Sequence, residues 1–224
     1  MTLTYFGKGR GGAGGSSDMG QQKFAAIQEV RAYWEALREG GRLPRRDQID
    51  PRGLSSALEQ VFLIERIAPG HARFRLAGMH LNDLMGMEVR GMPITALFEP
   101  AGRLRLSEAL EQVFAAPSVL DLWLEGERGI GRPALEGRMT ILPLLGSKGE
   151  PSLALGCLAT VGTLGRAPRR FTIAGLVREP VRLPLAAAPE AVGLIESGFA
   201  EAQAEFAPRP PRGKPNLRLV SSND

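Results

Sequence analysis

The residue types that most often carry chemistry in proteins are scarce in this chain and stand apart from one another. Its 224 residues include one cysteine, Cys157, and two histidines, His71 and His80. Structural zinc is usually held by about four Cys, His or acidic ligands at close spacing, and this set is too small and too dispersed. The chain has no Gly-x-Ser-x-Gly nucleophile motif and no spacing typical of a catalytic triad. We therefore expect a binding protein rather than an enzyme, and no metal.

A glycine-rich segment, GERGIGR at residues 126–132, is similar to a phosphate-binding loop in its glycine content. Such loops hold phosphate at the N-terminus of the helix that follows them. Here Pro133 and another strand-like stretch follow, so the sequence predicts a long hairpin turn. Glu125 and Glu127, which flank Gly126, are expected in solvent rather than in a catalytic pair.

Arginines account for the basic character of the chain, whose net charge is +4 and whose pI is about 9.7. They cluster at residues 42–46, 166–182 and 209–218. Such clusters can bind nucleic acid, a nucleotide or anionic lipid. No recognised nucleic-acid-binding motif accompanies them, so the sequence favours a solvated basic surface. A polyanion-binding module that uses Arg169 and Arg170 is the alternative.

The elements that position these residues follow from the spacing of the apolar residues. Residues 18–39 carry apolar side chains at three- and four-residue steps and predict an amphipathic helix, with Asp18 as its cap and Gly40-Gly41 at its end. The apolar stripe packs either on the chain's own sheet or on a second subunit, and the sequence leaves both open. The stripe consists of Phe24, Ile27, Val30, Trp34 and Leu37.

The middle of the chain is rich in predicted strands. VFLIERI at residues 61–67 and HARFRLAG at residues 71–78 flank a Pro-Gly turn and predict an antiparallel hairpin. A helical stretch broken by glycine and proline follows, and then a longer helix over residues 102–116. Three strands complete the order: VLDLWLEG, LEGRMTILPLL and SLALGCLATVG. The order predicts an α+β fold, a five-stranded antiparallel sheet with a helical crossover on one face, plus the N-terminal amphipathic helix.

The two ends of the chain differ in composition from this middle part. Residues 1–17 read as a flexible Gly-rich leader, and residues 18–58 as a helical cap or dimerisation segment. The α+β core is expected over residues 59–165 and a basic extension over residues 166–185. Residues 186–224, rich in Ala, Pro and Arg, are expected to be a disordered tail that includes at most one short helix.

The order of elements, together with several local phrases, resembles the PAS family of sensory domains, and more narrowly a bacterial variant found as a stand-alone protein. The resemblance covers about residues 27–165. It implies a curved sheet that encloses a small pocket with its helical crossover, and a role in signal transduction through small-molecule binding or protein contact. The phrases are YWEALREGGRLPRRDQIDP, FRLAGMHLNDLMGMEVRGMPITALF and MTILPLLGSKGEPSLALGCL.

Strand alternation nominates the wall of the pocket that this resemblance implies. The same side chains would equally serve to fill a core, and the sequence leaves both readings open. Arg73 and Arg75 alternate with two of these residues and are expected on the other face of the sheet. The nominated side chains are Phe62, Phe74, Leu76, Trp123, Met139 and Cys157 from the strands and Met85, Phe98 and Phe114 from the crossover.

The cofactor-bearing types within the resemblance make demands that this chain does not meet. A haem sensor of the family needs a histidine on the long crossover helix, and residues 102–116 contain none. A flavin photosensor needs a cysteine in the crossover, whereas Cys157 is predicted in the last strand. We expect neither haem nor flavin and leave an unidentified small molecule open. His80 is either a pH-sensitive group at the pocket mouth or an ordinary residue at a helix start.

The resemblance implies a sensory protein that acts through partners, because no other segment is typical of a kinase, a cyclase or a helix-turn-helix. The expected partners are a second copy of the chain, through residues 18–39, and an unknown signalling protein. Nucleic acid or anionic lipid belongs to the alternative reading. With one cysteine, and no apolar run near the roughly 18 residues of a membrane helix, we expect a cytoplasmic protein that is not transmembrane.

Overall fold

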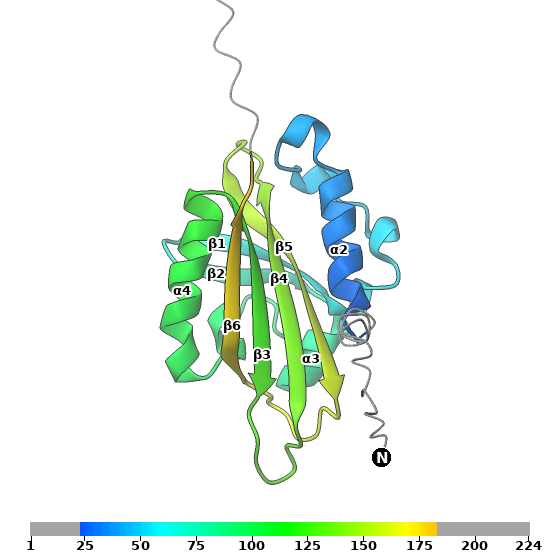
Figure 1. Ribbon diagram of the computed structural model, residues 1–224, viewed down its shortest axis with the longest axis vertical. Coiled ribbons are helices and arrows are strands. Elements are labelled where there is room, and N and C mark those ends of the chain that lie inside the picture. The colour runs from blue at the N-terminus through cyan, green and yellow to red at the C-terminus, as the bar shows by residue number, and fades with distance from the viewer. Residues whose placement is uncertain (1–22, 183–224) are drawn as a thin grey trace, which may run out of the picture. The chain divides into compact units, whose positions relative to one another are not determined.

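A sheet of six antiparallel strands, in the order β2-β1-β5-β4-β3-β6, forms the middle of the computed structural model, which describes residues 23–182 (Figure 1). The strands are β1 (Val61–Ala68), β2 (His71–Ala77), β3 (Ser118–Gly126), β4 (Leu135–Leu145), β5 (Pro151–Gly162) and β6 (Phe171–Pro180). The helices are α2 (Ala25–Ala36), α3 (Met79–Met85) and α4 (Pro100–Ala115). Short 3-10 turns lie at Glu39–Gly41, Arg46–Gln48, Pro51–Leu54, Leu58–Gln60 and Ile94–Leu97. The predicted α+β fold, with a hairpin, a helical crossover and a strand meander, is confirmed.

Strand β6 corrects the predicted five-stranded sheet, because it adds a sixth strand beside β3 within the stretch expected to be a basic extension. Its register pairs Leu176 with Leu122 and Phe171 with Gly126. The ring of Phe171 is fully buried next to Gly137, where a Cβ would come within 3.2 Å of it. Arginines and prolines surround the apolar residues that this strand contributes to the core, and the sequence pattern therefore does not indicate a strand here.

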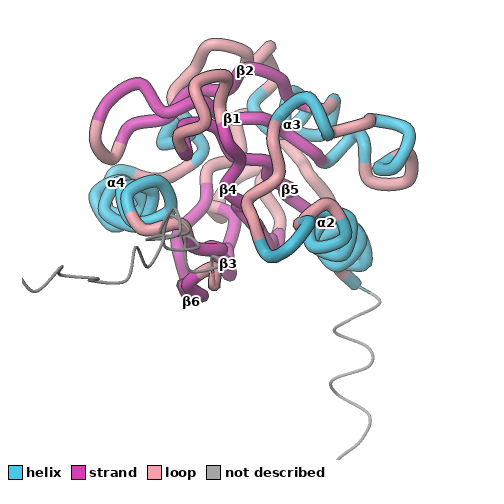
Figure 2. The backbone as a smooth tube through the Cα atoms, turned by 90° about the horizontal axis from the view of Figure 1, so that it is seen from above, coloured by secondary structure: helices cyan, strands magenta, loops and turns pink. Residues whose placement is uncertain are grey.

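Helices cover both faces of the sheet (Figure 2). Helices α3 and α4 pack on one face, which we call the crossover face, and α2 lies on the other, which we call the outer face. Each face has its own apolar core. On the crossover face the rings of Phe62 and Phe74 meet edge to face at 5.4 Å. Gly156 lies beneath Phe62, and a Cβ at this position would clash with the ring.

Helix α2 packs its apolar stripe on the chain's own sheet. Trp34 is fully buried, and its indole Nε1 donates a hydrogen bond of 3.0 Å to the carbonyl oxygen of Pro143. Phe24 and Val30 are also buried, whereas Ile27 and Leu37 are half-buried. The buried members of the stripe are therefore not on the surface for a second copy of the chain, and the homodimer itself stays a prediction.

The bounds of this helix also differ from the predicted range. The predicted cap, Asp18, lies outside the described residues. At the other end α2 stops at Ala36, three residues early, because Glu39–Gly41 form a 3-10 turn. Gly40 and Gly41 have φ values of 59° and 77°, a conformation that glycine adopts without strain and that ends a helix.

We expect Trp34 to hold α2 on the sheet. Trp34→Ala should lower the free energy of unfolding by about 3–5 kcal/mol, since a large buried side chain is lost. Trp34→Phe should lower it by about 1–3 kcal/mol, because the Pro143 carbonyl would stay buried without its donor. Urea denaturation followed by far-UV circular dichroism measures both. Leu104→Ala is the control, since this α4 side chain is 70% exposed. A cost below about 1 kcal/mol for Trp34→Ala would contradict the expectation.

Candidate functional site

Six of the nine nominated pocket residues lie on the crossover face, where they belong to one contiguous apolar cluster. Each is at most 5% exposed. Their side chains pack against one another and against the helices of the crossover, in the manner of a filled core. These six are Phe62, Phe74, Met85, Phe98, Phe114 and Met139.

Leu76 lies on the outer face, which corrects its assignment to the same pocket wall. The pairing of β1 with β2 changes register between Leu63 and Ile64: Leu63 pairs with Leu76, but Ile64 pairs with Phe74. Arg75 is therefore an extra residue in a β-bulge, and strict alternation fails on either side of it. Leu76 is 52% exposed.

Trp123 and Cys157 also lie on the outer face, contrary to the prediction. Trp123 pairs with Arg138 across β3 and β4, while its neighbours Leu122 and Leu124 point into the crossover-face core. Cys157 packs with Trp34 in the outer-face core. In a strand that is apolar on both faces, apolar and polar residues do not alternate. The sequence of such a strand does not show which side chains face the crossover.

The thiol of Cys157 is on the opposite side of the sheet from the crossover. It is buried, and this burial raises its pKa to about 12. A flavin photosensor of the family, as noted above, needs its cysteine in the crossover. The arrangement seen here does not fit that requirement.

Arg169 is fully buried, which corrects its proposed role on a basic surface. Its Nη2 donates to the carbonyl oxygens of Glu127 at 3.1 Å and Pro133 at 2.8 Å, and its Nη1 donates to the carbonyl of Leu164. The side chain thus ties the β3–β4 turn to the segment that precedes β6. Burial, and then Arg132, lower the pKa of Arg169, and Glu127 opposes them. Arg170 is exposed, as a surface role requires.

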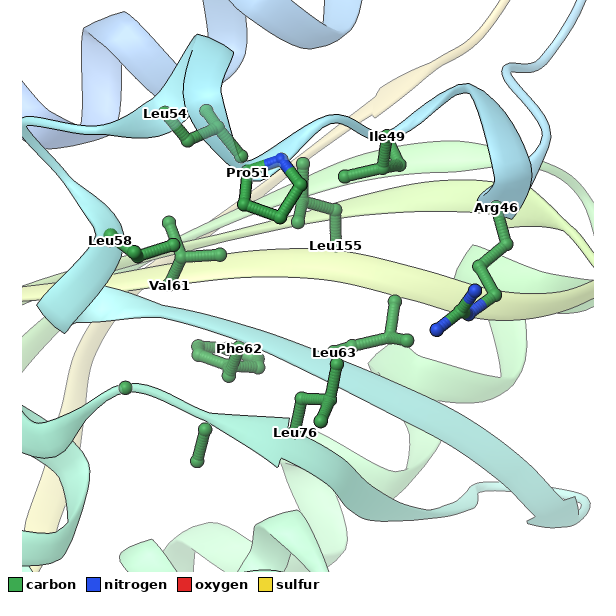
Figure 3. A pocket seen from close by; sticks show the side chains of 12 residues that line it. Arg46, Ile49, Pro51, Leu54, Leu58, Val61, Phe62, Leu63, Leu76 and Leu155 are labelled. Atoms are coloured by element: carbon green, nitrogen blue, oxygen red, sulfur yellow. The ribbon is translucent and has the colours of Figure 1, made fainter.

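Two hollows open on the outer face, at the seam between residues 23–60 and the strands. We call the first the edge groove; its volume is about 250 Å³ (Figure 3). It is almost wholly apolar, with the side chain of Arg46 at one end. Leu58 and Leu76 are its exposed large hydrophobic side chains. The lining consists of Arg46, Ile49, Pro51, Leu54, Leu58, Val61, Phe62, Leu63, Leu76, Ala77, Gly78 and Leu155.

The second hollow, which we call the helix pocket, lies between α2 and strands β3 and β4 and has a volume of about 420 Å³. Arg31 on α2 crosses one side of it, donating 2.9 Å to Asp121 on β3 and also to Glu179 on β6. The lining consists of Ile27, Gln28, Arg31, Ala32, Glu35, Asp121, Leu122, Trp123 and Arg138. Sequence reasoning missed this pocket, because no local pattern relates a helix residue to strands about 90 positions later.

His80 lies at the start of α3, half-buried. Its Nε2 is 3.0 Å from the hydroxyl of Thr160 on β5. Burial lowers the pKa of His80, and the negative charges of Asp83 and Glu59 oppose the shift. Within residues 23–182 no group of three or more His, Cys, Asp or Glu side chains is placed to hold a metal ion. None of the helices in the same range is long and apolar enough to cross a bilayer.

The raised pKa of Cys157 predicts a loss of stability at high pH. A thiol in the unfolded chain ionises near its ordinary pKa of 9.0, whereas the folded thiol keeps its proton up to about 12. Above pH 9 the unfolded state therefore binds fewer protons, and the free energy of unfolding should fall by up to about 1.4 kcal/mol per pH unit from this group. Urea denaturation at pH 8, 9.5 and 10.5 measures the fall. The control is Cys157→Ala, which should show a shallower profile, and parallel profiles would contradict the assignment.

Arg169 and its neighbour Arg170 form a matched pair for testing the buried role. Arg169→Lys should lower the free energy of unfolding by about 2–4 kcal/mol, because an ammonium cannot reach the carbonyls that the planar guanidinium spans. Arg170→Lys should change it by less than about 0.5 kcal/mol. Thermal and urea denaturation of the two variants give the comparison. Equal effects would show that the buried network contributes nothing of its own.

Comparison with known proteins finds a family model and solved structures to which this chain is similar. A family model described as a PAS domain matches residues 22–159, more than half of the chain. Light-state and dark-state structures of the LOV domain of the blue-light photoreceptor Aureochrome1 are similar at 16% identity; they cover 50% of this chain and 88% and 82% of their own, with TM-scores of 0.36 and 0.37. An RNA-binding light-oxygen-voltage receptor is similar at 18% identity, over 55% of this chain and 36% of its own, with a TM-score of 0.36. No curated protein matches. The chain belongs to the PAS domain family, whose members usually serve sensing and signalling.

Proposed function

We propose that this PAS protein is a sensory or regulatory module whose signal is a small molecule bound at the outer face of its sheet. Binding changes how residues 23–60, the N-terminal segment, pack on the strands. The altered segment then changes the contact of the protein with a signalling partner or with a second copy of itself. The partners remain predictions from the family resemblance.

The observation that supports this proposal is the position of the two hollows. Both the edge groove and the helix pocket are lined partly by the N-terminal segment and partly by strands. A molecule in either hollow contacts both layers, so its binding free energy depends on how the layers are packed. A ligand shifts a conformational equilibrium only by its difference in affinity for the two states. A ligand at the seam contacts the N-terminal segment and the strands together, so its affinity differs between two arrangements of these layers. The crossover-face residues nominated for a pocket are instead packed against one another.

The attachment of α2 is suited to such a shift. Its ion pairs, from Arg31 to Asp121 and Glu179, involve partly exposed side chains. Exposed pairs of this kind contribute only about 0–1 kcal/mol each. Most of the attachment therefore comes from the apolar burial of Val30 and Trp34. The polar contacts of α2 therefore do little to fix its position, which depends on the apolar packing beside the two hollows.

Octan-1-ol, a neutral probe of suitable size for the edge groove, tests the coupling between this groove and α2. It should slow amide hydrogen exchange, measured by mass spectrometry on the full chain, at residues 46–63 and also in α2. Leu76→Asp should abolish the effect by placing a charge in the groove. Leu104→Asp is the matched control, because this leucine is also exposed but lies on α4.

Two outcomes would contradict the proposal. Slowing confined to the groove residues, without α2, would show that the N-terminal segment does not respond to binding. An equal response in wild type and Leu76→Asp would show that the probe does not bind in the groove.

A further inference from the structure

Arg138 on β4 is a half-buried cation that lies against two aromatic rings. Its guanidinium carbon lies 5.2 Å from the ring centre of Phe24 and 5.1 Å from that of Trp123. Its Nε is buried and has no hydrogen-bond partner among residues 23–182. None of the ion pairs between described residues includes Arg138. The two rings stabilise the positive charge, but they do not supply an acceptor for the buried Nε–H.

The other charges around the helix pocket are already paired. Asp121 accepts from Arg31 at 2.9 Å, and Glu35 accepts from Arg38 at 2.9 Å. Asp121 shares Arg31 with Glu179, and neither Asp121 nor Glu35 is within ion-pair distance of Arg138. The charges of the described lining balance, with Arg31 and Arg138 against Glu35 and Asp121, but Arg138 is the member of this set that makes no ion pair with a described residue.

The size of the helix pocket is suited to a small organic molecule. Its volume of about 420 Å³ lies within the range of roughly 300–1,000 Å³ that is usual for small-molecule sites. Ile27, Ala32 and Trp123 supply apolar and flat surface beside Arg138. The guanidinium of Arg138 is packed against two rings, and its planar terminal N–H groups match the geometry that a carboxylate accepts through both oxygens.

We propose that the helix pocket binds a small organic carboxylate, with Arg138 as the residue that recognises its charge and Trp123 as the wall on which its flat or apolar body lies. A monoanion is favoured over a phosphate dianion, because Asp121 and Glu35 line the same pocket and would repel a second negative charge. The inference rests on the proposed function, for which this site is the input. Phe24 precedes α2 directly, so a ligand that engages Arg138 acts on the start of that helix.

Benzoate, a flat monoanion, is the probe, and proton–nitrogen correlation spectra of the full chain provide the readout. The chain has two tryptophans, so two indole N–H signals report on the outer face. The signal of Trp123 should shift and saturate with added benzoate, while that of Trp34, buried and bonded to Pro143, should not move. Benzamide, the neutral analogue, should cause no saturable shift up to about 10 mM, since it lacks the charge that Arg138 recognises.

The variants separate recognition of benzoate by Arg138 from a general electrostatic attraction of benzoate to a basic protein. Arg138→Gln should raise the Kd of benzoate at least about tenfold, and Arg138→Lys should raise it less, since charge is kept but the two-point contact is lost. Arg90→Gln, which removes an exposed arginine elsewhere, should leave the Kd unchanged. Where Arg138→Gln does not fold, the Arg138→Lys variant and the benzamide comparison decide.

Several results would overturn the site. These are equal binding of benzoate and benzamide, an unchanged Kd in the foldable Arg138 variants, displacement of benzoate by equimolar inorganic phosphate, or no saturable shift of Trp123. The failures of the two proposals are distinguishable. Benzoate binding that leaves α2 exchange unaltered keeps the site and removes the signalling mechanism, whereas a response of α2 to octan-1-ol without benzoate binding removes only the carboxylate site.

Discussion

The sheet of this protein is apolar on both faces, and both faces therefore have to be covered. In β4 every residue from Met139 to Leu144 is buried, so successive side chains enter opposite cores. An antiparallel sheet can leave one face in solvent, but a run such as this one cannot. The crossover covers one face, and the N-terminal segment covers the other with Trp34 at its centre. The N-terminal segment is thus part of the fold, as the family match from residue 22 also indicates.

The two coverings differ in how completely they fill the space beneath them, and this difference determines where a ligand can bind. On the crossover face the phenylalanines meet across the sheet, and Gly137 and Gly156 make room for the rings of Phe171 and Phe62. On the outer face a single helix and several short turns cover strands that extend beyond them. The edge groove and the helix pocket lie where this narrower layer ends.

Most of the fold could be predicted from the sequence, because turn residues separate the strands and the helical spacing of residues 24–37 is regular. The failures have local physical causes. Strand β6 was missed because arginine and proline dominate its surroundings, although Phe171 and Leu176 contact the core. Leu76 was assigned to the wrong face because the bulge at Arg75 cannot be read from alternation. The helix pocket could not be predicted from the sequence. Its lining joins Trp123 to Arg138 and to residues of α2, which come from separate parts of the chain.

Arg169 and Arg138 show what the structure adds to a count of arginines. In each of them the Nε is buried and has no partner in the part of the chain that the structure describes. The terminal nitrogens of Arg169 donate to backbone carbonyls on two loops, so that this charge is used to hold the protein together. Arg138 instead lies between the rings of Phe24 and Trp123 beside a hollow. Arg138 is half-buried, and a cation whose donors the described protein leaves without acceptors is suited to take them from a ligand. The distinction between a structural and a binding arginine therefore lies in which donors are already satisfied.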